Sequence, residues 1–231
     1  MIGSLWALAI ATFLFVGGHF ALSSRPVRGR LVAAVGEPRF LIAYSVFVGL
    51  AFVWMAFAYG AAPIVEVWVP PIGLRHVALT IMPLAFILLV GSLTTPNPSL
   101  AGADTGAIAV QGPVGFLKIT RHPMLWSFGL WGLCHLLANG DVASIILFGG
   151  LTVLALAGAK VIDAKKRALF GNAWEAYAAE TSYLPFQAML QGRTRLVFSE
   201  IGWWRIGLGV LLYAVALFAH EWLFGVTPLP L

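Results

Sequence analysis

The chain has 231 residues, of which 60% are hydrophobic and only 10% are charged. Soluble domains are about a quarter charged, so this composition excludes a water-soluble globular protein and indicates a multi-span membrane protein. The formal net charge of +5 fits contact with anionic lipid head groups and is no argument for nucleic-acid binding. The single cysteine, Cys134, excludes an intrachain disulfide.

Six apolar segments have about the length that a membrane-spanning helix needs, although the fourth is short. In chain order they are Ile2–Leu22, Phe40–Tyr59, Leu74–Leu93, Pro123–Ala138, Val142–Ala159 and Ile206–Phe224. No basic stretch precedes the first, so we expect an uncleaved anchor rather than an export signal. The predicted fold is all-α: a polytopic integral membrane helical bundle with about six transmembrane helices, forming one domain over residues 1–231.

The basic residues predict how the bundle is oriented. Of the 14 Lys and Arg residues, all but Arg75 lie in the connections between the first and second, third and fourth, and fifth and sixth segments. Under the positive-inside rule these connections face the cytoplasm. Both termini should then face outward.

Two connections have distinct patterns. The segment Thr94–Thr120 is rich in Pro, Gly and small residues, and we expect it to fold as a lid against the cytoplasmic face. Asn139, Gly140 and Asp141 predict a tight turn, so the fourth and fifth helices should form an antiparallel hairpin.

The long connection Lys160–Arg205 begins as a helix that leaves the membrane. Trp174 and Tyr177 follow at a spacing of three residues, which places them on one face of a helix. We expect an amphipathic helix on the membrane surface there, with plain interfacial packing as its role.

All five histidines lie inside or beside an apolar segment, and an ionisable group there is a functional-site hypothesis. With the predicted topology, His19 and His122 share the cytoplasmic leaflet, whereas His76, His135 and His220 lie toward the outer face. Taken singly, each also fits a hydrogen bond to a helix-end carbonyl or a place among head groups.

Glycines accompany two of these histidines. Gly17 and Gly18 directly precede His19, and Gly132 lies one turn before His135. Small residues would let a haem macrocycle approach each helix while the imidazoles bind iron. Glycines in membrane helices also mark close helix packing, which is the more general interpretation. Other metals are less favoured, because no carboxylate joins the histidines at ligand spacing.

Several motifs resemble the NnrU family over nearly the whole chain. They are GGHFALSSRP at 17–26, Asn97-Pro98, ITRHPMLWSFGLWGLCHLLANGD at 119–141 and FGNAWEAYAAETSYLPFQAMLQGR at 170–193. The resemblance implies a protein of the bacterial inner (cytoplasmic) membrane that is linked to denitrification and nitric-oxide metabolism. It also implies kinship with the zeta-carotene isomerases, membrane enzymes that use haem b.

That kinship implies cis–trans isomerisation of a lipophilic polyene by a haem whose ligands are His19 and His135. The predicted depths favour His19 with His122 instead, since axial ligands of one haem should lie nearly level. Gly132 stands where the isomerase has a cysteine, and Cys134 points about 200° around the helix, so a ligand exchange on iron is not expected.

A second resemblance is to membrane methyltransferases of the isoprenylcysteine carboxyl type, which use S-adenosylmethionine. It rests on Arg121, His122 and Pro123, followed after the hairpin by Asp163. In those enzymes the Arg-His-Pro segment and two glutamates hold the cofactor. Here one carboxylate is missing, because Ile162 precedes Asp163.

Arg121 and His122 have two further interpretations. They start a helix and anchor it among head groups, or they face a cytoplasmic-side cavity where Arg121 binds a haem propionate or another anionic group. Asp163 and Lys165 could line that cavity, but we expect them to be solvated. A non-enzymatic membrane partner or haem-based sensor in nitrogen-oxide metabolism would need the same histidines and no substrate slot.

Overall fold

The computed structural model describes residues 3–100 and 112–229, and regular structure in these residues is helical apart from one isolated bridge between Glu66 and Asp141. The helices are α1 (Leu5–Ser23), α2 (Arg25–Val35), α3 (Glu37–Gly60), α4 (Ile72–Thr94), α6 (Phe116–Ile119), α7 (Pro123–Asn139), α8 (Val142–Phe170), α9 (Asn172–Glu180), α10 (Gln187–Leu190), α11 (Phe198–Ile201) and α12 (Trp203–Phe224).

Five of the described helices are long and apolar enough to cross a membrane: α1, α3, α4, α8 and α12. The all-helical, multi-pass membrane fold is therefore confirmed. The predicted count of six is not, because α7 has only 17 residues, or about 25 Å at 1.5 Å per residue.

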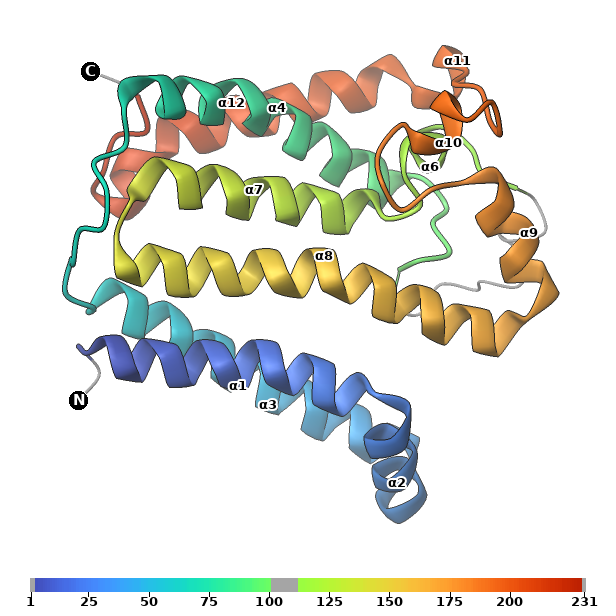
Figure 1. Ribbon diagram of the computed structural model, residues 1–231, viewed down its shortest axis with the longest axis horizontal. Helices are drawn as coiled ribbons and strands as arrows, with labels where there is room; N and C mark the ends of the chain where they lie inside the picture. The colour runs from blue at the N-terminus through green and yellow to red at the C-terminus, as the bar shows by residue number, and fades with distance from the viewer. Residues whose placement is uncertain (1–2, 101–111, 230–231) are drawn as a thin grey trace.

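The long helices run alongside one another in a layered arrangement (Figure 1). α7 packs between α4 and α8; α1 and α3 pack together, with α1 also against α8; and α12 packs on α4. Both termini lie at one end of the bundle, and α2, α9, α10 and α11 lie at the other. The latter end carries the basic connections, so we call it the inner end, as the charge pattern predicts.

The α7–α8 hairpin forms as predicted, and its turn explains how it is held. Gly140 ends α7 with φ +75°, and the Asp141 side chain caps α8 by accepting the Ser144 N–H at 2.9 Å. The Gly140 carbonyl also accepts the N–H groups of Val67 and Trp68. A side chain at Gly140 would meet the Trp68 carbonyl, so only glycine fits both the dihedral angle and the contact.

Glycines let the long helices approach closely. A Cβ on Gly132 of α7 would overlap the Thr152 hydroxyl of α8, and a Cβ on Gly18 of α1 would overlap the Phe47 ring of α3. Close approach of this kind is how membrane helices gain packing energy without a hydrophobic drive between them.

The outer surface of the bundle is apolar, as expected for contact with lipid. On α12 only Gly209 is buried, and Phe218 and Trp222 are 80% and 85% exposed. A soluble monomer does not expose so large an apolar surface to water, whereas the hydrocarbon of a bilayer accommodates it.

Three inner-end features differ from, or add to, the prediction. The segment after the first span contains the helix α2, which Pro26 starts and Gly36 ends. The described parts of the expected lid pack against the bundle, with Asn97 and Phe116 buried, while residues 101–111 lie outside the described residues. Trp174 and Tyr177 of α9 are buried in the protein rather than in the interface.

Candidate functional site

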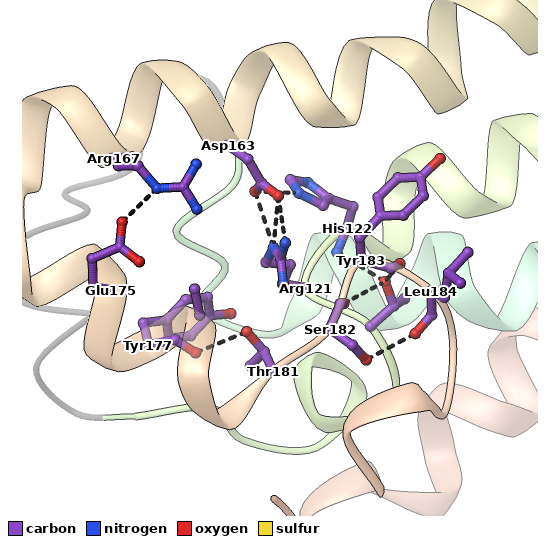
Figure 2. Close-up of polar contacts among 12 residues, drawn as sticks. Arg121, His122, Asp163, Arg167, Glu175, Tyr177, Thr181, Ser182, Tyr183 and Leu184 are labelled. Atoms are coloured by element: carbon purple, nitrogen blue, oxygen red, sulfur yellow. Dashed lines mark hydrogen bonds and ion pairs between the residues drawn. The ribbon is translucent and has the colours of Figure 1, made fainter. Parts of the chain in front are cut away.

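A buried ionic cluster lies at the inner end of the bundle, where the start of α7 meets α8 (Figure 2). The Asp163 carboxylate accepts hydrogen bonds from Arg121 Nε at 3.0 and 2.9 Å and from Arg121 Nη2 at 2.5 Å. His122 Nε2 lies 2.7 Å from the same carboxylate. His122 is fully buried and Asp163 is 7% exposed, so this charge is desolvated and paired on two sides.

The chain folds so that residues 41 and 42 positions apart meet here. The α7–α8 hairpin brings the start of α7 back beside the later turns of α8. Pro123 then fixes the first turn of α7, and the preceding residue, His122, has non-helical dihedral angles, φ −124° and ψ 56°. The imidazole is thereby aimed at α8.

The segment before α7 is hydrogen-bonded to the turn after α9. Arg121 N–H donates to the Ser182 carbonyl at 3.0 Å, and the Thr120 hydroxyl donates to the Tyr183 carbonyl at 2.8 Å. Trp126 Nε1 donates to the same Tyr183 carbonyl at 2.7 Å. These bonds fix the positions of Arg121 and His122 from the side opposite Asp163.

Three buried polar atoms of this region have no hydrogen-bond partner among the described residues: His122 Nδ1, Tyr177 Oη and Trp174 Nε1. Because a carboxylate only accepts, His122 donates through Nε2 to Asp163. Burial raises the pKa of the Tyr177 hydroxyl, outweighing the opposing influence of Arg121. Unpaired buried polar atoms are costly, so their grouping marks a site rather than ordinary core.

A cavity of about 390 Å³ lies beside the cluster. Its lining comes from Arg121, the last turn of α8, α9 and the chain that follows α9 through α10: Arg121, Arg167, Glu175, Ala178, Ala179, Thr181, Ser182, Tyr183, Gln187 and Arg193. Burial, and then the negative charge of Asp163, raise the pKa of the Tyr183 hydroxyl in this lining. Because charged and polar side chains make up most of this lining, the cavity is polar, although it adjoins an apolar bundle.

One expectation about this region was wrong. Asp163 was expected to be solvated, but it is buried between Arg121 and His122. Binding of a haem propionate or another anion by Arg121 stays a prediction, for which only Nη1 remains, because Asp163 takes Nε and Nη2. Lys165 is half-buried and lines a separate cavity with Arg28.

The structure does not bring His19 and His135 together. His19 lies near the C-terminal end of α1, with Nδ1 2.7 Å from the Phe15 carbonyl. His135 lies near the C-terminal end of α7, with Nδ1 2.8 Å from the Trp131 carbonyl. Those two helix ends are at opposite ends of the bundle (Figure 1), so the two imidazoles lie at different depths.

Side chains of neighbouring helices also occupy the space beside the glycines near these histidines. Phe47 fills the space over Gly18, and Thr152 fills the space over Gly132. A haem that His19 and His135 both ligate therefore does not fit this arrangement. His19 with His122 fits no better, because Asp163 engages the Nε2 of His122 and the ring neighbours of His19 are Phe15 and Tyr44.

His135 instead neighbours His220 at the outer end. Their ring centroids are 6.4 Å apart, and the His135 ring also stacks on Phe148. Each Nδ1 lies 2.8 Å from a backbone carbonyl, that of Trp131 or Val226, which leaves Nε2 as the nitrogen with a lone pair. No group of three His, Cys, Asp or Glu side chains in the described ranges is placed to hold a metal ion. The predicted topology placed both histidines toward the outer face, but nothing in the sequence indicated that two residues 85 positions apart are neighbours.

The model of the NnrU protein family matches residues 7–228. The chain belongs to the NnrU family. Two curated relatives are chloroplastic 15-cis-zeta-carotene isomerases: that of Zea mays is 34% identical over 82 residues, and that of Arabidopsis thaliana is 33% identical over 79 residues. The matches cover 36% and 34% of this chain but only 22% of each relative. No solved structure matches the chain significantly.

The NnrU resemblance read from the motifs is thus confirmed. Two of those motifs, around 119–141 and 170–193, supply both sides of the polar region: Arg121 and His122 from the first, and Tyr177, Ser182 and Arg193 from the second. The NnrU motifs therefore meet in space at the inner end of the bundle.

A second ion pair at the inner end gives a prediction about pH. Glu200 accepts the Gly115 N–H at 2.9 Å and a bond from Lys118 Nζ at 2.8 Å, which joins α11 to α6 and the residue before it. Burial favours a higher pKa for Glu200, but the Gly115 N–H and Lys118 together lower that pKa below its ordinary value.

Because the folded pKa of Glu200 is lowered, its stabilisation should be present at neutral pH and lost as the pH falls below the unfolded pKa of about 4.3. Thermal unfolding in detergent checks this between pH 7 and pH 3.5. The Glu200→Gln protein should lose less melting temperature on acidification than the unsubstituted protein. Parallel loss in both would show that Glu200 contributes nothing to the acid response.

Proposed function

We propose that this NnrU family member is a membrane enzyme that converts a cis double bond of a long polyene to the trans form. The observation that carries the proposal is the similarity to two proteins named as 15-cis-zeta-carotene isomerases, within a family match over residues 7–228. Those relatives are matched over about a fifth of their length, so their activity comes to this chain as a proposal only.

The fold supports a lipophilic substrate. A long polyene partitions into hydrocarbon, so its enzyme must receive it from the bilayer rather than from water. Large apolar side chains cover the lipid-facing helices, including Leu50 and Phe57 of α3 and Phe218 of α12. Such faces let a polyene diffuse to the protein without leaving the hydrocarbon.

The partly exposed rings of an aromatic cluster in the outer half of the bundle form the surface that suits a conjugated chain, whereas Phe148 at its centre is buried. Trp131 and His135 of α7 pack on Phe148 of α8, with ring centroids 5.2 and 4.7 Å apart. Tyr59 of α3 joins them at 5.6 Å from Phe148. Flat π-surfaces stack on a planar polyene and orient it.

The proposal includes haem b, which the resemblance implies, but with a ligand pair other than His19 and His135. The histidines that support it are His135 and His220, because their rings are neighbours and both keep Nε2 for a ligand. Haem held there would supply the electronic polarisation that lowers the double-bond character of a diene. The chain's own residues would orient the substrate and keep water out.

Absorption spectra of the purified protein in detergent, oxidised and reduced, test the cofactor. We expect a six-coordinate b-type spectrum that is lost in both His135→Ala and His220→Ala and kept in His76→Ala, which removes an exposed histidine. Loss in His19→Ala with retention in His220→Ala would restore the pair that the resemblance implies. Colourless protein from cells with ample porphyrin would end the haem proposal.

Methyl transfer from S-adenosylmethionine is the second candidate function. It is favoured by the meeting of Arg121, His122 and Asp163 beside a cavity of about 390 Å³, within the range of small-molecule sites. Calorimetry with S-adenosylmethionine tests it. Measurable affinity in a protein without a haem spectrum would place methyl transfer ahead of isomerisation.

The link to nitrogen-oxide metabolism and the bacterial inner membrane are also proposals here. A non-enzymatic sensor would bind nitric oxide at a reduced haem and leave a cis-polyene unchanged. Spectra recorded with nitric oxide, beside a polyene conversion assay, separate the sensor from the enzyme.

A further inference from the structure

The cavity beside the ionic cluster has an excess of positive charge. Three arginines line it, Arg121, Arg167 and Arg193, and Glu175 is the only carboxylate that the described residues contribute to the lining. Asp163 pairs with Arg121 and Glu175 with Arg167, whereas no carboxylate pairs with Arg193 in the described part of the chain. Among residues 3–100 and 112–229, three guanidinium groups thus meet two carboxylates, which leaves one positive charge.

Each arginine is held in place yet keeps nitrogen atoms for a ligand. Arg193 Nη1 donates to the carbonyls of Ala179 and Thr181 at 2.5 and 2.7 Å, which anchors it at the end of α9. Arg167 donates through Nε to Glu175, and its remaining nitrogens point toward Arg121 in Figure 2. Within residues 3–100 and 112–229, Nη1 of Arg121, both Nη of Arg167 and Nη2 of Arg193 form no hydrogen bond.

The position of the cavity indicates what brings the anion. Arg167 lies in the last turn of α8, a membrane-spanning helix, at the inner end of the bundle. The phosphates of the inner-leaflet lipids lie at the ends of spanning helices. The cavity volume of about 390 Å³ exceeds what a bare phosphate ion fills, since one water occupies about 30 Å³.

We propose that this cavity binds the head group of an anionic glycerophospholipid, with its phosphodiester between Arg167, Arg193 and the free Nη1 of Arg121. A phosphodiester carries one negative charge, which matches the unpaired positive charge. Glu175 and the half-buried Gln187 then accept and donate hydrogen bonds to head-group hydroxyls, as phosphatidylglycerol supplies. The site is separate from the aromatic surface proposed for the polyene and does not depend on it.

Native mass spectrometry of the delipidated full-length protein tests this with added phosphatidylglycerol or phosphatidylcholine. Phosphatidylglycerol should bind at least about tenfold more tightly: both lipids carry a phosphodiester, but phosphatidylcholine brings a quaternary ammonium to a positively charged lining and has no head-group hydroxyls for Glu175 and Gln187. Arg167→Gln should remove about that factor. Arg195→Gln, which removes an equal charge two residues beyond Arg193 and outside the lining, should change affinity less than about twofold. Glu175→Gln should strengthen binding, because it removes a negative charge from the lining.

Equal retention of the two lipids would overturn the proposal, as would equal losses in the Arg167 and Arg195 variants, which would indicate general surface charge. Circular dichroism confirms that each variant is folded, and the opposite shift in Glu175→Gln cannot arise from unfolding. Soluble competitors decide the source of the anion. Displacement of the lipid by millimolar inorganic phosphate, or by S-adenosylmethionine, would contradict a lipid site and assign the cavity to a soluble ligand.

Discussion

Asp163→Ala is expected to destabilise the folded protein by about 3–5 kcal/mol, because it leaves a desolvated guanidinium without its carboxylate. Arg121 has a side chain only 13% exposed and donates three hydrogen bonds to Asp163. His122 Nε2 would lose its partner as well. Reversible unfolding in mixed detergent, followed by circular dichroism, measures the change.

Two comparisons make this result specific. Glu175→Ala breaks an arginine pair at the same end of the molecule, but both of its side chains are 52% exposed, so the loss should stay below about 1 kcal/mol. Replacing both Asp163 and Arg121 with leucine should recover much of the stability lost in Asp163→Ala, since an apolar pair leaves no uncompensated charge. Equal losses in the Asp163 and Glu175 variants would mean that the cluster is not desolvated.

Gly132→Ala is expected to destabilise the α7–α8 pair by about 1–3 kcal/mol through overpacking. The new methyl group would overlap the Thr152 hydroxyl and lie 3.2 Å from the Phe148 carbonyl oxygen. Both partners belong to α8, so the helices must separate. Thermal unfolding in detergent measures the effect, and Thr152→Ala in the same chain should relieve part of it.

Gly149→Ala is the matched control, because no atom lies within 4 Å of its Cβ position. It should leave the melting temperature unchanged or raise it slightly, as alanine favours helix more than glycine does. The Gly132 variant also separates two roles of that glycine. If a macrocycle lay against Gly132, the substitution would change a haem spectrum and leave helix packing intact.

The sequence predicted the elements of the fold well because local patterns decide them. Long apolar runs give the spanning helices, Asn139 to Asp141 gives the hairpin, and the asymmetry of Lys and Arg gives the arrangement of the ends. The helix α2 was missed because its sequence is polar and basic rather than apolar, although Pro26 and Gly36 mark its start and end.

The site was harder to predict because its contacts are distant in sequence. His122 and Asp163 are 41 residues apart, and Asp163 was expected to be solvated. His135 and His220 meet only through the packing of the outer helix ends. The spacing of Trp174 and Tyr177 identified a helical face correctly, yet composition does not distinguish a face that meets lipid from one that meets protein.

The account predicts that the protein, reconstituted in nanodiscs and reduced, converts 15-cis-zeta-carotene to an isomer with a trans central bond, followed by chromatography with absorbance detection. Conversion should fall sharply in His135→Ala and persist in His76→Ala. Folded protein that leaves the cis-polyene unchanged, both oxidised and reduced and with any cofactor restored, would contradict the proposed function.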